Sequence, residues 1–237
     1  MNCLYKNETI DYDFFNSNCK ETILFLHGWG GNKFSFQPTI NLLKNQFNIL
    51  TVTIPTIDPT VSVWNMFDYV SLIENILNLH SIKNPIIVCH SFGFRIAMIL
   101  NKKINIKKIV VTGGAGIKIE NIFRKIIKNN NKIILKNNIF KNFYKKIASI
   151  DYLYLSKTNK ETFKNVVNLN LNFAIKFDCP MLLFWGKKDK DTKLWIAHNI
   201  QRKNQAKLIL VDSDHFAYIK HSNLFNHEIL NFIGNNG

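Results

Sequence analysis

A serine at a sharp turn is the feature of this sequence with the clearest chemical potential. Residues 85–88 form a short apolar run typical of a buried strand, Ser91 follows it, and a helical pattern begins at Phe94. A serine between a strand and a helix sits on a strained turn that presents its hydroxyl as a nucleophile, and the residues two before and two after it must be small. Gly93 meets that requirement fully, and Cys89 stands where glycine is usual. The match is therefore C-x-S-x-G.

A serine hydroxyl becomes a useful nucleophile only when a histidine takes its proton and a carboxylate orients that histidine. Asp189 follows the apolar run 181–185. His215 follows the run 208–211. The order serine, acid, histidine is the one used when the serine lies on a strand-to-helix turn. Because the carboxyl ends of parallel strands lie at one edge of a sheet, we expect Ser91, Asp189 and His215 to meet there as nucleophile, acid and base.

Other residues near these runs leave alternatives open. Three further carboxylates are alternatives to Asp189 as the acid: Asp191, Asp212 and Asp214. Asp178 comes before its apolar run, so it belongs to the opposite edge of the sheet. His90, beside the serine, is expected to support the structure rather than to react.

The negative oxygen of a tetrahedral intermediate needs hydrogen-bond donors at the same edge. The backbone amides of Phe92, directly after the serine, and of Trp29, in the loop after the apolar run 22–26, are the predicted donors. Glycines in this loop allow it to approach a substrate closely. The candidates for substrate contact are His27, Gly28, Trp29, Tyr152 and Tyr154. The alternative is that His27 braces the loop and that the two tyrosines only pack.

The elements that must position these residues alternate along the chain. Two short alternating stretches within 4–15 predict an opening hairpin around Asn7 and Glu8. Apolar runs predict strands at 22–26, 49–54, 85–88, 106–111, 181–185 and 208–211. Spacings of three and four residues predict helices near 36–47, 63–77, 94–100, 192–203 and 224–233. This alternation predicts an α/β fold: a mostly parallel central β-sheet with helices on both faces.

The segment from about 118 to 177 interrupts this alternation. Its apolar residues form helical stripes at 119–127, at 139–147 and around Phe163 and Val166. The pattern predicts a small helical insertion whose apolar stripes turn toward the sheet. The predicted domains are a core, 1–117 and 178–237, and a helical cap, 118–177.

The charge of the chain is strongly positive and uneven. The formal net charge is +15, and residues 118–176 hold thirteen lysines and arginines against three acidic residues. A basic segment this local could attract an acidic partner. The alternative is a solvated lysine face, because Asn, Lys and Ile are abundant throughout the chain. The lysines are not interleaved with aromatic residues in a nucleic-acid motif, so no nucleic-acid partner is expected.

The composition is that of a globular protein with one sizeable core. The chain has 237 residues, of which 46% are hydrophobic and 20% charged. No apolar run approaches the roughly 20 residues needed to span a membrane, and the first residues lack a signal-peptide pattern. The four cysteines form no C-x-x-C pair. Three histidines spaced by six residues point to different faces of a helix: His215, His221 and His227. We therefore expect a cytoplasmic protein with no metal and no cofactor.

Four short motifs together resemble those of the α/β-hydrolase superfamily. They are His27-Gly28-Trp29-Gly30, His90-Ser91-Phe92-Gly93, Trp185-Gly186-x-x-Asp189 and Asp214-His215-Phe216. The resemblance covers nearly the whole chain and implies Ser91 as nucleophile, Asp189 as acid and His215 as base, with a helical cap inserted after the sixth strand. Two positions depart from the pattern, because Cys89 replaces the usual glycine and Asp214 stands where glycine is common. Neither departure removes a reacting group.

These observations predict a serine hydrolase that cleaves carboxylic esters through an acyl-enzyme intermediate and acts on a small-molecule ester or acyl substrate. Three alternatives stay open. The loop 27–32 and the basic segment resemble esterases that remove a methyl ester from a pimeloyl chain on acyl carrier protein, an acidic protein that could dock on the basic cap. Carbon–carbon bond hydrolases use the same triad. A ligand sensor can retain it without rapid turnover.

Overall fold

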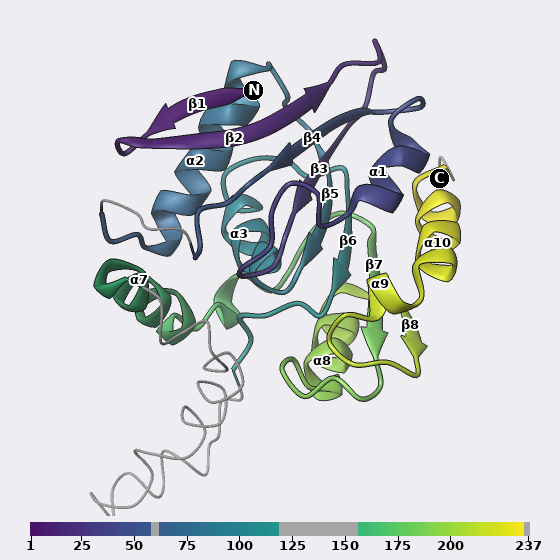
Figure 1. Ribbon diagram of the computed structural model, residues 1–237. Helices are drawn as coiled ribbons and strands as arrows, with labels where there is room; N and C mark the ends of the chain where they lie inside the picture. Colours follow the sequence, from purple (N-terminus) through teal and green to yellow (C-terminus); the bar gives the residue numbers. More distant parts are fainter. Residues whose placement is uncertain (58–61, 119–155, 235–237) are drawn as a thin grey trace, which may run out of the picture.

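An eight-stranded sheet runs through the molecule (Figure 1). The computed structural model describes residues 1–57, 62–118 and 156–234. The strands are β1 (Asn2–Tyr5), β2 (Glu8–Phe15), β3 (Thr22–Leu26), β4 (Asn48–Val52), β5 (Ile86–His90), β6 (Lys108–Thr112), β7 (Met181–Gly186) and β8 (Lys207–Val211). Their spatial order is β1-β2-β4-β3-β5-β6-β7-β8. The pairs β1–β2 and β2–β4 are antiparallel, and the pairs from β4 to β8 are parallel. The predicted mostly parallel sheet is confirmed.

The sheet begins with the hairpin that the sequence predicts. Tyr5 pairs with Glu8, so Lys6 and Asn7 form a two-residue turn. Both turn residues have positive φ, 49° and 64°. A turn with two positive φ angles matches the twist of the flanking strands, and asparagine tolerates this conformation better than most residues. β2 then pairs with β4 and joins the hairpin to the parallel part of the sheet.

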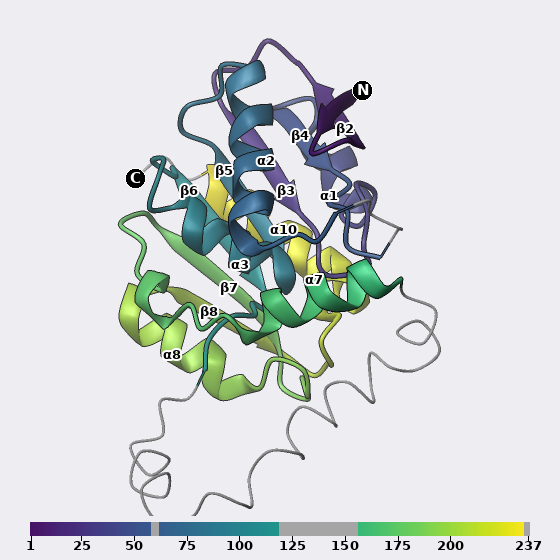
Figure 2. The same ribbon diagram turned by 90° about the vertical axis from the view of Figure 1, so that its left-hand side faces the viewer.

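Helices cover both faces of the sheet. They are α1 (Gln37–Leu43), α2 (Met66–Leu79), α3 (Phe92–Leu100), α7 (Lys157–Asn168), α8 (Leu194–Asn204), α9 (Ala217–Lys220) and α10 (Ser222–Gly234), with a 3₁₀ turn at Asn172–Ala174. Figure 2 shows α2, α3 and α8 on the near face and α10 behind the sheet. Side chains of α2, α3 and α8 form one hydrophobic cluster, and those of α1, α9 and α10 form the other. Because both faces are covered, β3 to β7 are buried along their whole length and their sequences show no polar alternation.

The start of α2 shows how local chemistry sets a helix boundary. Hydrophobic spacing predicts the helix from about residue 63, but it begins at Met66. The Asn65 side chain accepts hydrogen bonds from the backbone amides of Phe67 and Asp68, and the Asp68 carboxylate accepts one from the Asn65 amide. This reciprocal capping satisfies amides that have no partner inside the helix. The polar cap therefore overrides the apolar periodicity.

Within the predicted cap, the structure describes α7 and the residues that follow it. The Trp64 amide donates to Thr162 Oγ1 at 2.9 Å, and Arg95 Nη1 donates to the carbonyls of Val166 at 2.9 Å and Leu169 at 3.1 Å. Carbonyls at the end of a helix lack partners within it, and a cation there complements the helix dipole. Burial lowers the pKa of Arg95 to about 10, which leaves it charged at neutral pH. The two other predicted helical stripes, 119–127 and 139–147, lie outside the described residues.

Candidate active site

The candidate nucleophile Ser91 lies on the turn from β5 into α3 in a strained conformation. Its φ and ψ are 49° and −105°, and it is one of few residues other than glycine with positive φ. The turn is held by the Ser91 amide, which donates to the Thr112 carbonyl at 3.1 Å, and by the Ala115 amide, which donates to the Ser91 carbonyl at 3.1 Å. A non-glycine residue persists in such a conformation only where its surroundings impose it.

The small residues around Ser91 are explained by how closely α3 approaches β3. A Cβ atom added to Gly93 would lie 2.2 Å from the carbonyl oxygen of Leu26, so no larger residue fits. Cys89, the departure from glycine two positions before the serine, is fully buried. Its Sγ lies 3.6 Å from the Val110 carbonyl, and burial raises the pKa of its thiol. The thiol therefore stays neutral and packs as a small apolar group.

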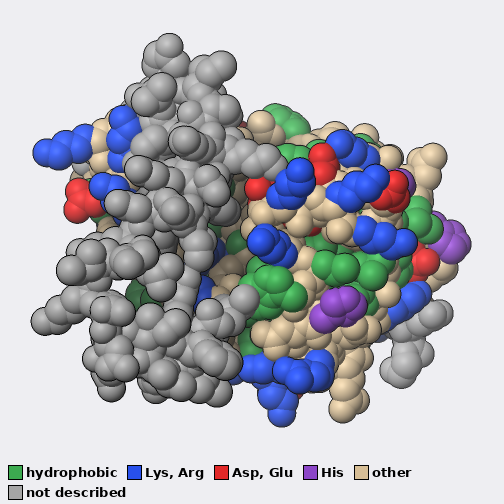
Figure 3. Space-filling view, turned by 90° about the horizontal axis from the view of Figure 1, so that it is seen from below, with side chains coloured by type: hydrophobic (Ala, Val, Ile, Leu, Met, Phe, Trp, Pro, Cys, Tyr) green, Lys and Arg blue, Asp and Glu red, His purple; other side chains and the backbone are tan. Residues whose placement is uncertain are grey.

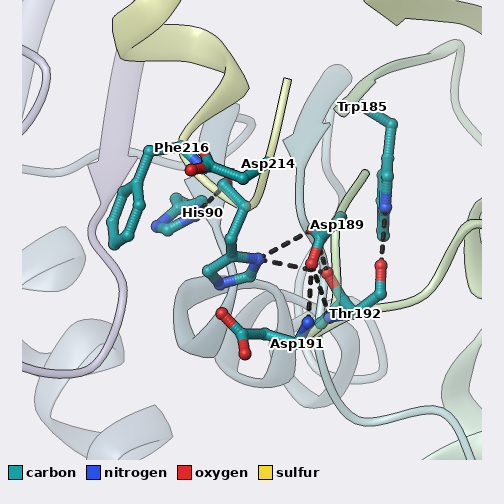
Figure 4. Close-up of polar contacts among 8 residues, drawn as sticks. His90, Trp185, Asp189, Asp191, Thr192, Asp214 and Phe216 are labelled. Carbon is teal, nitrogen blue, oxygen red and sulfur yellow. Dashed lines mark hydrogen bonds and ion pairs between the residues drawn. The ribbon is translucent and has the colours of Figure 1, made fainter. Parts of the chain in front are cut away.

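The candidate acid and base are directly bonded. His215 Nδ1 donates to Asp189 Oδ2 at 2.8 Å. The Asp189 side chain is completely buried and accepts three more hydrogen bonds: from Thr192 Oγ1 and the Thr192 amide, both at 2.8 Å, and from the Asp191 amide at 2.9 Å. Figure 4 shows Asp189 and Thr192 with these bonds drawn as dashed lines. The loop that carries Asp189 therefore holds the carboxylate in place independently of the imidazole.

The electrostatics of Asp189 favour the charged form. Burial raises the pKa of this carboxyl group, but the hydrogen bond and charge of His215 and the hydrogen bonds from Thr192 lower it by more, so its pKa lies below the ordinary value. A carboxylate that stays ionised at neutral pH fixes the proton of His215 on Nδ1. This tautomer leaves Nε2 as a proton acceptor. Thr192 was not recognised from the sequence, although its position three residues after the acid is a typical place for such a bond.

The other three carboxylates proposed as acids have different surroundings. Asp212 pairs with Lys188 at 2.8 Å, and Asp214 pairs with Lys220 at 2.7 Å. Asp214 also accepts a hydrogen bond from the Phe216 amide, so its position before the histidine shapes the turn into α9, which the sequence did not predict. Asp191 is half-buried beside the site. Among these carboxylates, the geometry favours Asp189 as the acid.

Carboxylate and imidazole side chains such as these could also bind a metal ion. Atoms of Asp189, Asp191 and His215 that could act as metal ligands lie within 4.8 Å of one another. In this arrangement, however, the facing atoms of Asp189 and His215 are bonded to each other. The group is therefore arranged to orient an imidazole.

The structure brings Ser91 to the same edge of the sheet as His215. β5, β6, β7 and β8 are neighbours, so the residues after them are adjacent. Gly113, after β6, contacts the His215 imidazole so closely that an added Cβ would lie 2.9 Å from two ring atoms. An added Cβ on Gly28 would lie 3.4 Å from Ser91 Cβ. Ser91 Oγ makes no hydrogen bond to a residue that the structure describes, and bonds of this kind often tighten only when substrate binds.

Two buried histidines support the site without contacting solvent. His90 Nε2 lies 3.2 Å from the His215 carbonyl, and its ring packs 4.6 Å from the His215 ring. His27 accepts a hydrogen bond from the Ile54 amide at 2.8 Å and lies 2.7 Å from the Gly28 carbonyl, so both of its ring nitrogens have backbone partners. Burial lowers the pKa of His27 to about 4 and that of His90 to about 3. The bracing role is favoured over substrate contact for His27.

The two residues whose amides are the predicted oxyanion donors contact each other through their side chains at this edge. Phe92 begins α3, Trp29 follows β3, and their rings meet edge to face at 5.3 Å. Phe163 of α7 also packs edge to face against the indole, with 4.8 Å between the ring centroids, a contact that the sequence did not reveal. The loop is tied down by the Gly30 amide, which donates to Thr56 Oγ1 at 3.0 Å. Tyr152 and Tyr154, the other proposed substrate contacts, lie outside the described residues.

Comparisons with known proteins identify the fold. No protein-family model and no curated protein matches the sequence. Solved structures do match: a hydrolase from Pseudomonas aeruginosa (TM-score 0.77, 11% identity, covering 99% of this chain and 98% of that one) and MGS-M2, an α/β hydrolase from a deep-sea metagenome (0.75, 17%, 100% and 98%). An esterase from Exiguobacterium antarcticum also matches (0.72, 13%, 95% and 96%). This chain has the α/β-hydrolase fold. The fold that the resemblance of the four motifs implies is confirmed.

In this α/β-hydrolase fold, the three candidate residues follow β5, β7 and β8 at the carboxyl edge of the sheet. The predicted division into a core and a cap at 118–177 stays a prediction, because most of that segment lies outside the described residues. Among the helices in the described ranges, none has the length and apolar character needed to cross a membrane.

Proposed function

We propose that this protein is a serine hydrolase that cleaves carboxylic esters through an acyl-enzyme intermediate. The observation that carries the proposal is the 2.8 Å hydrogen bond between His215 Nδ1 and the buried Asp189, at the sheet edge that holds the strained Ser91. Strain at a serine, a fixed imidazole tautomer and a buried carboxylate have a joint explanation in nucleophilic catalysis. Esterases among the solved structures with this fold support the choice of an ester.

In the proposed first half-reaction, Ser91 Oγ attacks the ester carbonyl carbon while His215 Nε2 takes the hydroxyl proton. Asp189 stabilises the resulting imidazolium through Nδ1. The bond between the carbonyl carbon and the alcohol oxygen then breaks, and His215 returns the proton to that oxygen. The products of this step are the free alcohol and an ester between the acyl group and Ser91.

In the second half-reaction, His215 takes a proton from water as the water oxygen attacks the acyl carbon. The bond to Ser91 Oγ breaks, and the serine oxygen recovers the proton from the imidazolium. A carboxylic acid leaves. The backbone amides of Trp29 and Phe92 are the proposed donors to the negative oxygen in both half-reactions, and the loss of one such donor typically costs about 100- to 1,000-fold in rate.

Hydrolysis of p-nitrophenyl esters from acetate to decanoate tests this proposal, with the unaltered protein compared with Ser91→Ala. We expect turnover that depends on chain length and falls by at least about a thousandfold in Ser91→Ala. Ser17→Ala, in the loop between β2 and β3, is a control that should keep full turnover. Equal turnover in Ser91→Ala and the unaltered protein would contradict the assignment of the nucleophile.

An acyl carrier protein as substrate carrier is a finer part of the same proposal. The lysines that suggested it belong to 118–176, and most of that range lies outside the described residues. Comparing kcat/KM for a p-nitrophenyl ester with kcat/KM for the same acyl group on acyl carrier protein distinguishes a free substrate from a carrier-linked one. A carrier-linked ester turned over with much higher kcat/KM supports docking, and equal values support free small-molecule esters.

A further inference from the structure

The sheet edge that carries Ser91 also exposes large apolar side chains. Four of them, which we call the apolar rim, are Phe34 (57% exposed), Ile57 (42%), Phe216 (47%) and Ile219 (54%). They come from the segments after β3, β4 and β8, so they belong to the carboxyl edge of the sheet. Single exposed apolar residues are common, but several around one site indicate a surface with a partner.

The apolar rim lies on both sides of the candidate active site. The Phe216 ring is 5.5 Å from the rings of both His90 and His215. Ile219 is one turn further along, and its amide donates to the Phe216 carbonyl at 3.1 Å. On the other side, an added Cβ on Gly30 would lie 3.8 Å from Ile57 Cγ2, which places Ile57 beside the proposed oxyanion loop.

Exposed cations accompany the apolar rim. Lys187, Lys190 and Lys193 are exposed on the connection from β7 to α8. Within the described ranges they form no ion pair, whereas Asp212 and Asp214 are paired with lysines of their own. β7 and β8 point downward in Figure 1, and Figure 3, which views the molecule from below, shows hydrophobic side chains among lysine and arginine side chains on this face.

We propose that this edge docks on the surface of an anionic lipid bilayer or micelle, with the apolar rim entering the boundary between headgroups and acyl chains. Exposed aromatic and aliphatic groups beside lysines suit such a boundary, because the lysines contact anionic headgroups while the apolar groups leave water. Each lysine near an anionic surface strengthens binding by about fivefold. The formal net charge of +15 adds long-range attraction to the same surface.

This docking goes beyond the proposed ester hydrolysis and does not depend on it. Binding to a lipid surface requires neither Ser91 nor turnover, so the two proposals can fail separately. Docking would bring the site against esters held in the lipid surface. An acidic protein is a different class of partner, and the experiment separates it from a lipid surface.

The test is co-sedimentation of full-length Ser91→Ala with vesicles of phosphatidylglycerol and, separately, of phosphatidylcholine. We expect binding to the anionic vesicles and at least about tenfold weaker binding to the zwitterionic ones. Phe34→Ser combined with Ile219→Ser should weaken binding to the anionic vesicles about tenfold. Leu79→Ser, which alters an equally exposed residue at the far end of α2, should change it less than twofold.

Charge reversal supplies the second comparison. The triple variant Lys187→Glu, Lys190→Glu and Lys193→Glu should bind vesicles much more weakly than a matched triple variant near the opposite edge. The matched variant changes three other exposed lysines: Lys20→Glu, Lys44→Glu and Lys83→Glu. Equal losses from the two triple variants, or no loss from the Phe34 and Ile219 variant, would overturn the proposal. Binding to acyl carrier protein but not to vesicles would also overturn it. Vesicle binding without ester turnover would instead refute only the proposed function.

Discussion

The two edges of the parallel sheet differ in the chemistry that their side chains carry. At the amino edge, lysines meet glutamates from neighbouring elements: Lys107 pairs with Glu21, and Lys207 with Glu228 at 2.7 Å. The carboxyl edge instead holds Ser91 at positive φ. It also holds two histidines kept neutral by burial. The carboxyl edge has ion pairs too, but it alone combines them with a strained serine and unprotonated bases among the described residues.

Buried hydroxyl groups also distinguish the carboxyl edge. Thr112 Oγ1, at the end of β6, and Ser213 Oγ, just after β8, are buried without a hydrogen-bond partner among the residues that the structure describes. Such groups are uncommon in folded proteins because each unsatisfied polar atom costs free energy. Both hydroxyl groups lie at the carboxyl edge, so the residues of this edge are not the ones that would give the highest stability. This is the expected trade-off where a fold carries a reactive site.

The largest effect should come from removing the charge of Asp189. Asp189→Asn keeps the shape but loses the acceptor that fixes the His215 tautomer, so kcat should fall by about 10⁴-fold. Asp191→Asn, two residues away, should change kcat by less than about tenfold, because His215 Nδ1 keeps its hydrogen bond to Asp189 Oδ2 in that variant. Turnover of the best p-nitrophenyl ester measures both variants. Equal losses of kcat in the two variants would contradict the assignment of Asp189 as the acid.

Acidification should destabilise the protein through the buried histidines. The pKa of His27 is about 4 and that of His90 about 3 in the folded protein, against an ordinary value of 6.5. Above pH 6.5 both are neutral in either state. Below it the unfolded chain binds protons that the folded protein does not, so the free energy of unfolding falls as pH drops toward the folded pKa values. From pH 7 to pH 5 the loss should be about 2 kcal/mol for each histidine.

Urea unfolding at pH 7 and pH 5 measures this dependence. His27→Gln should remove about half of the combined loss of about 4 kcal/mol, because one of the two proton-binding groups is gone. His198→Gln changes an exposed histidine on α8 and should leave the difference unaltered. If all three proteins lose the same stability, the two buried histidines are not the source of the acid sensitivity.

The smallest expected effect compares the contribution of a buried cation to the free energy of unfolding with that of an exposed ion pair. Arg95→Met leaves the carbonyls of Val166 and Leu169 without their donor in a buried setting, which should cost about 2–3 kcal/mol of unfolding free energy. Lys103→Met breaks the pair with Glu74 at 2.5 Å, a partly exposed contact that should contribute less than about 1 kcal/mol. Thermal or urea unfolding compares the two. A larger loss in Lys103→Met would mean that surface pairing contributes more than the buried contact.

Much of the fold could be predicted because its signals are local. The buried strands are recognisable in the sequence as apolar runs. The structure places β3, β5 and β7 within one or two residues of those runs. The boundaries were less predictable, since polar caps such as Asn65 override hydrophobic spacing. The short helix α9 was missed because four residues carry no periodicity.

The candidate site was predictable in its members and not in its contacts. Chain order and strand ends already singled out Ser91, Asp189 and His215, but four carboxylates competed as the acid. The choice among them depends on how the loops after β7 and β8 pack together, and no local pattern encodes that packing. The supporting role of His90 was expected from its place beside the serine, whereas the hydrogen bonds from Thr192 to Asp189 were not recognised from the sequence.

The sequence by itself determined which reactive residues this protein has and that they follow strands of one parallel sheet, because apolar runs and turn residues act on their immediate neighbours. Only the tertiary structure decided that Asp189 meets His215, that Phe163 packs against Trp29, and that the exposed ring of Phe216 lies beside His215. Residues far apart in the chain are joined by packing. Packing depends on the shape and satisfaction of every neighbour at once, so it cannot be read from any one segment.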